Sequence, residues 1–362
     1  MNKQAIILLV IPHLGGGGAE RVVALLAAGL NPNRFQVHLG LVTQTDAAGF
    51  ALPPNVTVHG IGARRVRSGW WKLLRLVRNL KPDVILSGMT HLNLLLLLLR
   101  PLFPRKTRVL VRQNGCVLAG ESLSAYRKLY SRADAIVCQS SAMASDLARL
   151  VSMKPKLRVL PNPVDLLAIR NLTRSAPPLW TGPGPHLLAV GRLAPEKGFD
   201  LLLQAFARVR NRFPSADLTI VGEGREKAAL EMTAGLVGVR TAVRFTGHVD
   251  LPAAWFPGAT AFVLSSRHEA LPNALLEAAA AGLPLVATPA SQGVVDLLRG
   301  QPGVWIAPAI SVDAIAAALE AALDTVKLES RFAHDWVNAF SHDRAIAAYE
   351  SFLDEWIAEP VL

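Results

Sequence analysis

The sequence predicts an α/β protein built from two doubly wound domains, and two observations lead to that prediction. Short apolar runs alternate with helix-like stretches over the first 160 residues or so, and the alternation restarts after residue 185. Strands that alternate with helices pair in parallel and form a sheet with helices on both faces. Between the two series, residues 171–185 read NLTRSAPPLWTGPGP, and we interpret this Pro- and Gly-rich stretch without periodicity as the linker.

Each domain has its own series of strands. In the first, residues 1–170, we predict strands at 5–11, 36–42, 56–59, 83–87, 108–112, 135–138 and 157–160. In the second, residues 186–342, we predict them at 186–190, 217–221, 242–245, 260–264, 284–287 and 304–306. The tail, residues 343–362, contains an amphipathic helix over 343–357.

Length and composition fit this organisation. The chain has 362 residues, enough for two ordinary domains, and 51% are hydrophobic. Its two cysteines, Cys116 and Cys138, are too few for a disulfide framework, and we expect reduced thiols in the cytoplasm. The apolar run 5–11 leads into a glycine loop instead of a cleavage site, so we expect a strand and not a signal peptide. The leucine block 94–99 is far shorter than the roughly 20 residues of a membrane-spanning helix.

Charge is distributed unevenly. Residues 1–180 hold 24 Lys and Arg against 7 Asp and Glu, and residues 181–362 hold 14 against 20. The stretch 63–81, ARRVRSGWWKLLRLVRNLK, combines basic residues and tryptophan with an apolar helical face. That pattern favours an anionic membrane surface. A solvated helix packed on the domain is an equal alternative; nucleic acid is a weaker one, since no recognised binding motif accompanies the charge.

Two acidic residues lie around a predicted helix start in the second domain. Residues 267–282 read RHEALPNALLEAAAAG, in which Asn273 is a good N-cap and Gly282 a natural end. Glu269 then lies in the loop before the helix and Glu277 within it. The exposed N–H groups of residues Leu271 to Asn273, with Pro272 between them, suit a phosphate at the positive end of the helix dipole. We interpret this as a sugar-nucleotide site; an ordinary amphipathic helix with two surface glutamates is the alternative.

A second element carries positive charge. GRLAPEKGFD at 191–200 follows the predicted strand 186–190, and Arg192 and Lys197 are spaced so that both can reach one diphosphate. A guanidinium and an ammonium group are the usual protein groups for binding such a leaving group. Two solvated cations in a turn are the alternative for this element taken alone.

Together these segments resemble the retaining glycosyltransferases of family four, which have the GT-B fold. The resemblance covers nearly the whole chain and rests on HLGGGGAERVV (13–23), VLPNPVD (159–165), GRLAPEKG (191–198), IVGEGREKAALE (220–231), VRFTGHV (243–249) and EALPNALLE (269–277). It implies two domains facing a cleft, with the C-terminal helix packed back on the first. It also implies transfer of a sugar from a nucleoside diphosphate, UDP above all, to a glycan or polyprenyl-linked acceptor.

The resemblance and the residue chemistry together assign roles. Arg192 and Lys197 neutralise the leaving diphosphate, Glu269 contacts the donor sugar, and Glu277 holds the ribose. Gly16, Gly17 and Gly18 let the first domain approach the transferred sugar. Many family members carry a His after the strand matching 108–112, where this chain has Gln113 and Asn114; His91 is a further acceptor-side candidate. Ala270 also replaces a frequent Gly, and Asp296 a frequent Glu.

Other chemistries have little support in the sequence. There is no Asp-x-Asp, no P-loop and no Cys/His cluster, and GGGGAE departs from the dinucleotide fingerprint G-x-G-x-x-G. We therefore expect no metal and no cofactor other than the donor itself. We also expect a place in cell-envelope polysaccharide synthesis on the inner face of a bacterial cytoplasmic membrane. A sugar-nucleotide epimerase of the same architecture and a non-catalytic sugar-nucleotide-binding protein are the alternatives.

Overall fold

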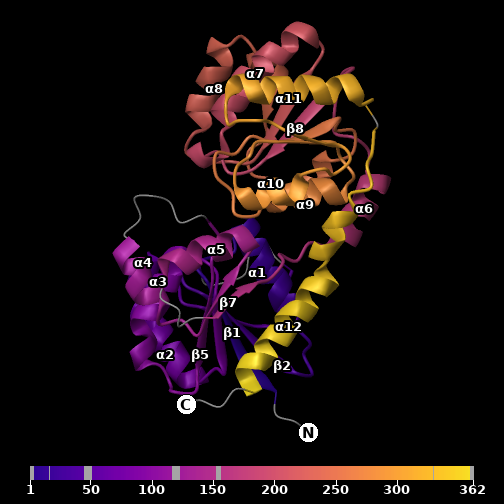
Figure 1. Ribbon diagram of the computed structural model, residues 1–362. Coiled ribbons are helices and arrows are strands. Elements are labelled where there is room, and N and C mark those ends of the chain that lie inside the picture. The colour runs from indigo at the N-terminus through magenta and orange to yellow at the C-terminus, as the bar shows by residue number, and fades with distance from the viewer. Residues whose placement is uncertain are drawn as a thin grey trace. The chain divides into compact units, whose positions relative to one another are not determined.

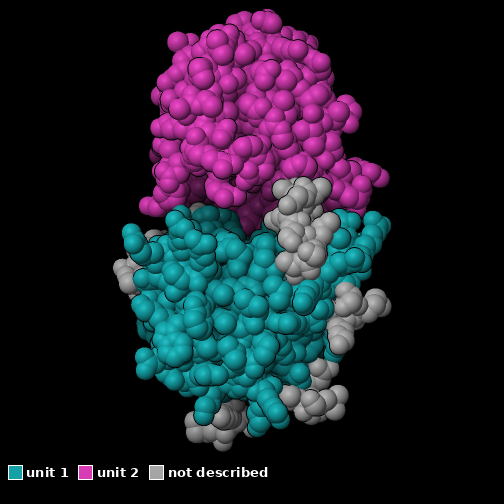
Figure 2. Space-filling model, turned by 90° about the vertical axis from the view of Figure 1, so that its left-hand side faces the viewer, with its two compact units in different colours: residues 1–164, 339–362 teal, residues 165–338 magenta. Residues whose placement is uncertain are grey.

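The structure is a computed structural model that describes residues 4–15, 17–44, 51–115, 123–151, 156–328 and 330–358. It divides into two compact units (Figures 1 and 2). Unit 1 consists of Met1–Val164 and Ala339–Leu362, and unit 2 consists of Asp165–Asn338. Each unit is a parallel sheet with helices on both faces, so the predicted α/β class is confirmed.

Unit 1 contains a seven-stranded sheet in the order β3-β2-β1-β4-β5-β6-β7. Its strands are β1 (Ala5–Ile11), β2 (Phe35–Leu41), β3 (Thr57–Gly60), β4 (Val84–Ser87), β5 (Arg108–Arg112), β6 (Ala135–Cys138) and β7 (Lys156–Val159). The central strand β1, AIILLVI, is apolar throughout because helices cover both of its faces. Its pairing with β2 starts at Ala5 opposite Phe35, and its pairing with β4 starts at Ile7 opposite Val84.

Six helices formed by described residues cover this sheet. They are α1 (Gly18–Gly29), α2 (Trp70–Leu80), α3 (Thr90–Leu99), α4 (Leu123–Tyr130), α5 (Ser141–Leu150) and α12 (His342–Ala358). In Figure 1, α1 and α12 lie on one face and α2 to α5 on the other. The main core of unit 1 joins alternate residues of β1 to α1 and to the apolar side of α12, whose buried residues include Phe352 and Trp356.

Unit 2 repeats the design with six parallel strands in the order β10-β9-β8-β11-β12-β13. The strands are β8 (His186–Val190), β9 (Asp217–Val221), β10 (Val243–Phe245), β11 (Ala261–Leu264), β12 (Leu285–Ala287) and β13 (Val304–Ile306). Figure 1 shows α7 (Phe199–Arg212), α8 (Lys227–Leu236) and α11 (Val312–Thr325) on one face, with α9 (Asn273–Ala280) and α10 (Gln292–Leu298) on the other. All 13 predicted strands are found within a residue of their predicted ends.

The predicted linker, residues 171–185, is wrong at its start. Helix α6 occupies Leu166–Ser175, and unit 2 already begins at Asp165. The Asp165 side chain caps this helix by accepting the Ala168 N–H, while Leu166 and Ile169 are buried. The N-cap and the buried apolar residues stabilise a helix where the sequence reading placed the end of the first domain.

Two further expectations fall on described residues. Cys138 is a free thiol with no solvent exposure, and burial raises its pKa to about 12, so it stays protonated at neutral pH. Cys116 lies outside the described residues. Across the described parts of the chain, no helix combines the length and the apolar character needed to cross a bilayer.

We predict that the packing of α12 stabilises unit 1. Phe352 is 3% exposed within the core of unit 1, so Phe352→Ala should lower the free energy of opening by about 3–5 kcal/mol. Hydrogen exchange at the β1 amides reports this quantity for unit 1 alone. The exposed neighbour Ser351→Ala is the control and should change it by less than about 0.5 kcal/mol. Equal protection in the two variants would contradict the prediction.

Candidate active site

The strand order defines one special point on each sheet. In unit 2 the chain moves from β8 towards β10 on one side and from β11 towards β13 on the other. The loops that follow β8 and β11 therefore lead to helices on opposite faces of the sheet, α7 and α9. Ligands of open parallel sheets bind at such a switch point, outside the carboxyl ends of the strands. The segments 191–198 and 265–273 are these two loops.

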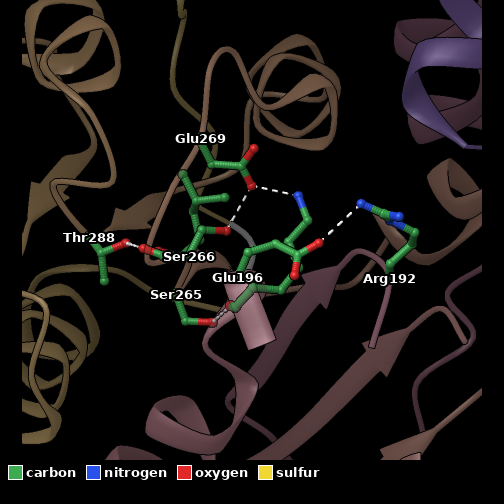
Figure 3. A network of polar contacts seen from close by, with 8 residues as sticks. Arg192, Glu196, Ser265, Ser266, Glu269 and Thr288 are labelled. Atoms are coloured by element: carbon green, nitrogen blue, oxygen red, sulfur yellow. Dashed lines mark hydrogen bonds and ion pairs between the residues drawn. The ribbon is translucent and has the colours of Figure 1, made fainter. Parts of the chain in front are cut away.

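The two loops are joined by a bond between predicted site residues. Lys197 Nζ lies 2.5 Å from Glu269 Oε1, and the side chains are 21% and 10% exposed (Figure 3). Glu269 Oε1 also accepts the Ser266 hydroxyl at 2.8 Å. The Lys197 stem passes over Gly191, where a Cβ atom would come within 3.5 Å of it. Its ammonium group is thus held at the carboxyl end of β8, with one of its three N–H groups bonded to Glu269.

Close backbone contact sets this geometry. Gly198, at φ +62°, ends the short 3₁₀ helix η3 (Pro195–Lys197), and a Cβ there would be 2.1 Å from Ser265 O. Ser265 in turn donates its hydroxyl to Lys197 O at 2.9 Å. Only glycine at position 198 allows both the left-handed turn and this approach.

An arginine fork fastens the second loop to helix α7. Arg267 donates through both terminal nitrogens to the Asp200 carboxylate at 2.7 Å and to Pro195 O at 2.8 Å. The hydrogen bond from Arg267 lowers the pKa of Asp200, and the same bond raises the pKa of Arg267. This bidentate geometry requires arginine, because a lysine offers no planar pair of donors.

A hydrogen bond between uncharged groups holds the loop after β11 near its start. Thr288, after β12, donates its hydroxyl to Ser266 O at 2.6 Å (Figure 3). Glu269 N–H also reaches Ala290 O at 3.3 Å. Glu269 is therefore held between three strand ends, those of β8, β11 and β12.

Arg192 remains available to a ligand. Its side chain is 75% exposed and bonds only Glu196, at 3.0 Å, among the contacts described for it. An exposed pair four residues apart contributes little to stability, so exchanging Glu196 for a phosphate costs little. Arg192 lies on the same loop as Lys197, as the sequence predicts.

The start of α9 corrects one prediction. Asn273 is the first helical residue and Pro272 occupies the N-cap position, because Pro272 O already accepts the Leu275 and Leu276 N–H groups at 3.0 and 3.3 Å. Pro272 has no N–H group, so of the predicted amides only those of Leu271 and Asn273 exist as donors. Gly282, at φ +76°, follows the helix as predicted.

Glu277 lies one turn inside α9 and is 7% exposed. The alternative of two surface glutamates is therefore wrong, because neither Glu269 nor Glu277 is a surface residue. The contact of Glu277 with a ribose stays a prediction.

Unit 1 has its own switch point, between β1 and β4. Gly17 precedes α1 there, and His91 is the second residue of α3, after β4. Gly16 lies outside the described residues; Gly18 begins α1. Burial, with a smaller contribution from nearby His13, lowers the pKa of His91. Sequence reasoning missed His13 and the 7%-exposed Glu20, whose carboxylate lies 3.9 Å from His13 Nδ1.

The two amides after β5 differ in availability. Gln113 is buried; its Nε2 donates to Gly115 O at 2.8 Å, and its Oε1 accepts the Tyr130 hydroxyl at 2.8 Å. Asn114 Oδ1 accepts Gln139 Nε2 at 3.2 Å, while the buried Nδ2 has no hydrogen-bond partner among the described residues. Asn114 therefore has a buried N–H donor group that no described residue uses, whereas both ends of the Gln113 amide are bonded within the protein.

A hollow of about 470 Å³ lies elsewhere on unit 2. Trp180, Asp217, Arg240 and Arg244 line it, at the amino ends of β9 and β10. It is at the opposite edge of the sheet from Lys197 and Glu269, so we do not assign the predicted ligand to it. The described residues contain no group of three or more His, Cys, Asp or Glu side chains arranged to hold a metal ion.

Comparison with known families identifies both halves of the chain. Residues 16–166 match the model of Glycosyltransferase Family 4, and residues 184–325 match that of Glycosyl transferases group 1. The first match lies almost wholly in unit 1 and the second lies in unit 2.

Curated relatives agree with these matches. The lipopolysaccharide core biosynthesis glycosyltransferase LpsE of Rhizobium meliloti is 28% identical, over 78% of this chain and 78% of its own. A Campylobacter jejuni N-acetylgalactosaminyltransferase named for a diphospho-undecaprenol substrate is 27% identical, over 80% of this chain and 82% of its own. The chain covers 61% of an uncharacterized glycosyltransferase of Methanocaldococcus jannaschii, which is 27% identical over 63% of this chain.

Solved structures share the fold. Sucrose-phosphate synthase of Thermosynechococcus elongatus superposes with a TM-score of 0.82 at 18% identity, covering 98% of this chain and all of that one. Anabaena HepE, solved in complex with UDP and glucose, gives 0.74 at 16% identity, over 97% of this chain and all of that one. These likenesses show that the chain has the GT-B fold, with two parallel-sheet α/β domains.

We predict that Lys197 and Glu269 depend on each other for stability. Lys197→Met leaves the largely buried Glu269 carboxylate without its cation and should cost on the order of 3 kcal/mol. The double variant K197M/E269Q removes both charges and should recover most of that loss in urea unfolding. The exposed Lys227→Ala is the control. Additive losses in the double variant would show that the two groups do not interact.

The Asp200–Arg267 fork should respond to acid. Because the folded pKa of Asp200 is lowered, the carboxylate contributes stability above its ordinary pKa of about 3.9, and this contribution is lost as the pH falls further. The difference in melting temperature between wild type and Asp200→Asn should therefore be largest near neutrality and shrink below about pH 4. The 89%-exposed Asp250, replaced by Asn, should give a smaller difference at neutrality. A D200N difference that does not change with pH would contradict the assignment.

Proposed function

Because the chain belongs to the group 1 and family 4 glycosyltransferases, we propose that it transfers a sugar, with retention, from a nucleoside diphosphate to a glycan or lipid-linked acceptor. The observation that carries the proposal is the Lys197–Glu269 bond at the switch point of unit 2, with exposed Arg192 on the same loop. This combination offers fixed positive charge next to a buried carboxylate, at the edge where parallel sheets bind ligands.

The chemistry explains why this arrangement suits a sugar nucleotide. When the bond between the anomeric carbon and the diphosphate oxygen breaks, negative charge collects on the diphosphate and positive charge on the sugar ring. In this proposal Lys197 and Arg192 stabilise the first, and the carboxylate of Glu269 contacts the sugar hydroxyls or the ring. Groups held in place before reaction stabilise developing charge most effectively.

The two positive side chains supply the charge that a divalent metal supplies in many other transferases, so we propose that the reaction needs no metal. UDP is the proposed nucleotide, supported by the HepE complex with UDP and glucose. Glu277 and the amides of Leu271 and Asn273 would complete the donor site. The supporting observation is that all three residues lie on the segment that begins α9.

Unit 1 would bind the acceptor. The supporting residues are Gly17 and His91 at its switch point, and Asn114 after the neighbouring strand β5. The names of LpsE, of the Campylobacter transferase and of an amylovoran transferase from Erwinia amylovora support an acceptor in cell-envelope polysaccharide synthesis. We also propose that the enzyme works on the cytoplasmic face of the membrane.

The proposal predicts both binding and turnover. A panel of UDP-, GDP- and ADP-sugars should contain at least one that raises the melting temperature, since a ligand of the native state stabilises it. With that donor, K197M/E269Q should lose about 100- to 1000-fold in rate while staying folded. Lys227→Ala should react as wild type, and EDTA should not change the rate.

Three outcomes separate the alternatives. Donor converted to a different sugar nucleotide without any acceptor would indicate an epimerase. A donor that binds but is never consumed would indicate a non-catalytic binding protein. Loss of turnover on chelation would overturn the metal-independent chemistry.

A further inference from the structure

Helix α3 exposes a row of leucines. Leu94, Leu95 and Leu98 lie on the side of the helix opposite its buried residues, and Leu102 continues the row in the 3₁₀ turn η2 (Arg100–Leu102). Leu98 is 58% exposed and Leu102 is 44% exposed, whereas Leu92, Leu96 and Leu97 on the inner side have no exposure. An amphipathic helix in water carries polar residues on its outer side, so this outer row lacks its expected polar cover.

Helix α2 borders this row with aromatic and basic side chains. Arg78 Nε donates to Leu102 O at 3.2 Å, which brings this side of α2 against the end of α3. Trp71 and Arg75 precede Arg78 by seven and three residues and therefore lie on the same side of α2. Trp71 is 56% exposed and packs edge-on against Trp70. We call these residues and the leucine row the α2–α3 face.

The charge around this face has one sign. Residues 51–115 contain 12 Lys and Arg and a single acid, Asp83. Asp83 is partly buried, and its carboxylate accepts the Ile6 N–H of β1 at 2.8 Å. Five of the exposed basic residues of this region form no ion pair with a described carboxylate: Arg64, Arg67, Arg75, Arg105 and Lys106.

We propose that the α2–α3 face is the surface by which unit 1 binds an anionic phospholipid bilayer. Leu98, Leu102 and Trp71 would enter the boundary between headgroups and acyl chains, and the surrounding arginines would contact lipid phosphates. Leucine and tryptophan beside unpaired arginine are the chemistry of helices that lie in this interface. Figure 2 views unit 1 from the side on which Figure 1 labels α2, α3 and α4.

The same features disfavour other occupants. A second copy of the chain across a twofold axis would place these arginines opposite identical arginines without any acid to separate them. A nucleic acid would satisfy the arginines but leave the leucine row without an apolar partner. An anionic bilayer satisfies both groups at once.

The position of the α2–α3 face fits the proposed function, and the role that we give to membrane binding rests on that function. The leucine row starts close to His91 at the first turn of α3, next to the edge of the sheet that carries Gly17 and Asn114. A bilayer held along the row would present the headgroup of a lipid-linked acceptor to that edge. The bilayer is then the partner of unit 1, the unit that we propose binds the acceptor.

The test is flotation of the full-length protein with vesicles of phosphatidylglycerol and phosphatidylcholine, compared with phosphatidylcholine alone. Wild type should bind only the anionic vesicles, and less at high salt. Leu98→Glu with Leu102→Glu should weaken binding at least tenfold, and Arg75→Glu with Arg105→Glu should do the same. The matched control is Met232→Glu with Leu236→Glu, two exposed α8 residues with the same spacing, which should bind as wild type.

Each result has one meaning. Unchanged binding in the L98E/L102E variant, or equal binding to both vesicle types, would overturn the proposal. So would a wild-type dimer in light scattering that this variant makes monomeric. Donor hydrolysis in buffer without vesicles tests the site in unit 2 separately and should be the same in all four proteins. Vesicle binding without any donor turnover would support this face and contradict the proposed function.

Discussion

The site depends on one contact, the bond between Lys197 and Glu269 that joins the loops after β8 and β11. A parallel sheet whose connections diverge at a switch point leaves an opening but does not fill it with chemistry. Here the missing side chain of Gly198 brings the two loops into backbone contact, and the Arg267–Asp200 fork holds the second loop against α7. The positive and negative groups can then lie 2.5 Å apart, near water but mostly covered.

The fold was largely readable from the sequence because buried parallel strands are continuous apolar runs. β1, β5 and β8 have the predicted ends, since their apolar residues stop where the loops begin. Helix starts were less readable. Helix α6 begins at the Asp165 N-cap and is stabilised by two buried apolar residues, although the first domain was predicted to end within this segment. Helix α9 has Pro272 at its N-cap position, where Asn273 was expected.

The site was readable in part, for a physical reason. The motifs indicated which charged residues belong to the candidate site, Lys197 and Glu269 among them, because each of these residues lies in a short segment with a recognisable pattern. The supporting bonds join residues far apart in the chain, such as Arg267 with Asp200 and Thr288 with Ser266, and no local pattern announces them. In unit 1, the buried Glu20 likewise looked like an ordinary helix residue after a glycine loop.

Unit 2 is inserted into unit 1 at a single seam. The chain leaves unit 1 after Val164 and returns at Ala339, and the two crossings are bonded side by side: Val164 N–H donates to Phe340 O, and His342 N–H donates to Val164 O, each at 2.9 Å. Because the chain leaves and re-enters unit 1 at adjacent points, unit 2 is an insertion whose two ends lie side by side. Recombination could therefore exchange unit 2 for the equivalent unit of a relative by joining the chain at two points that lie side by side, and the sheet of unit 1 would stay unchanged.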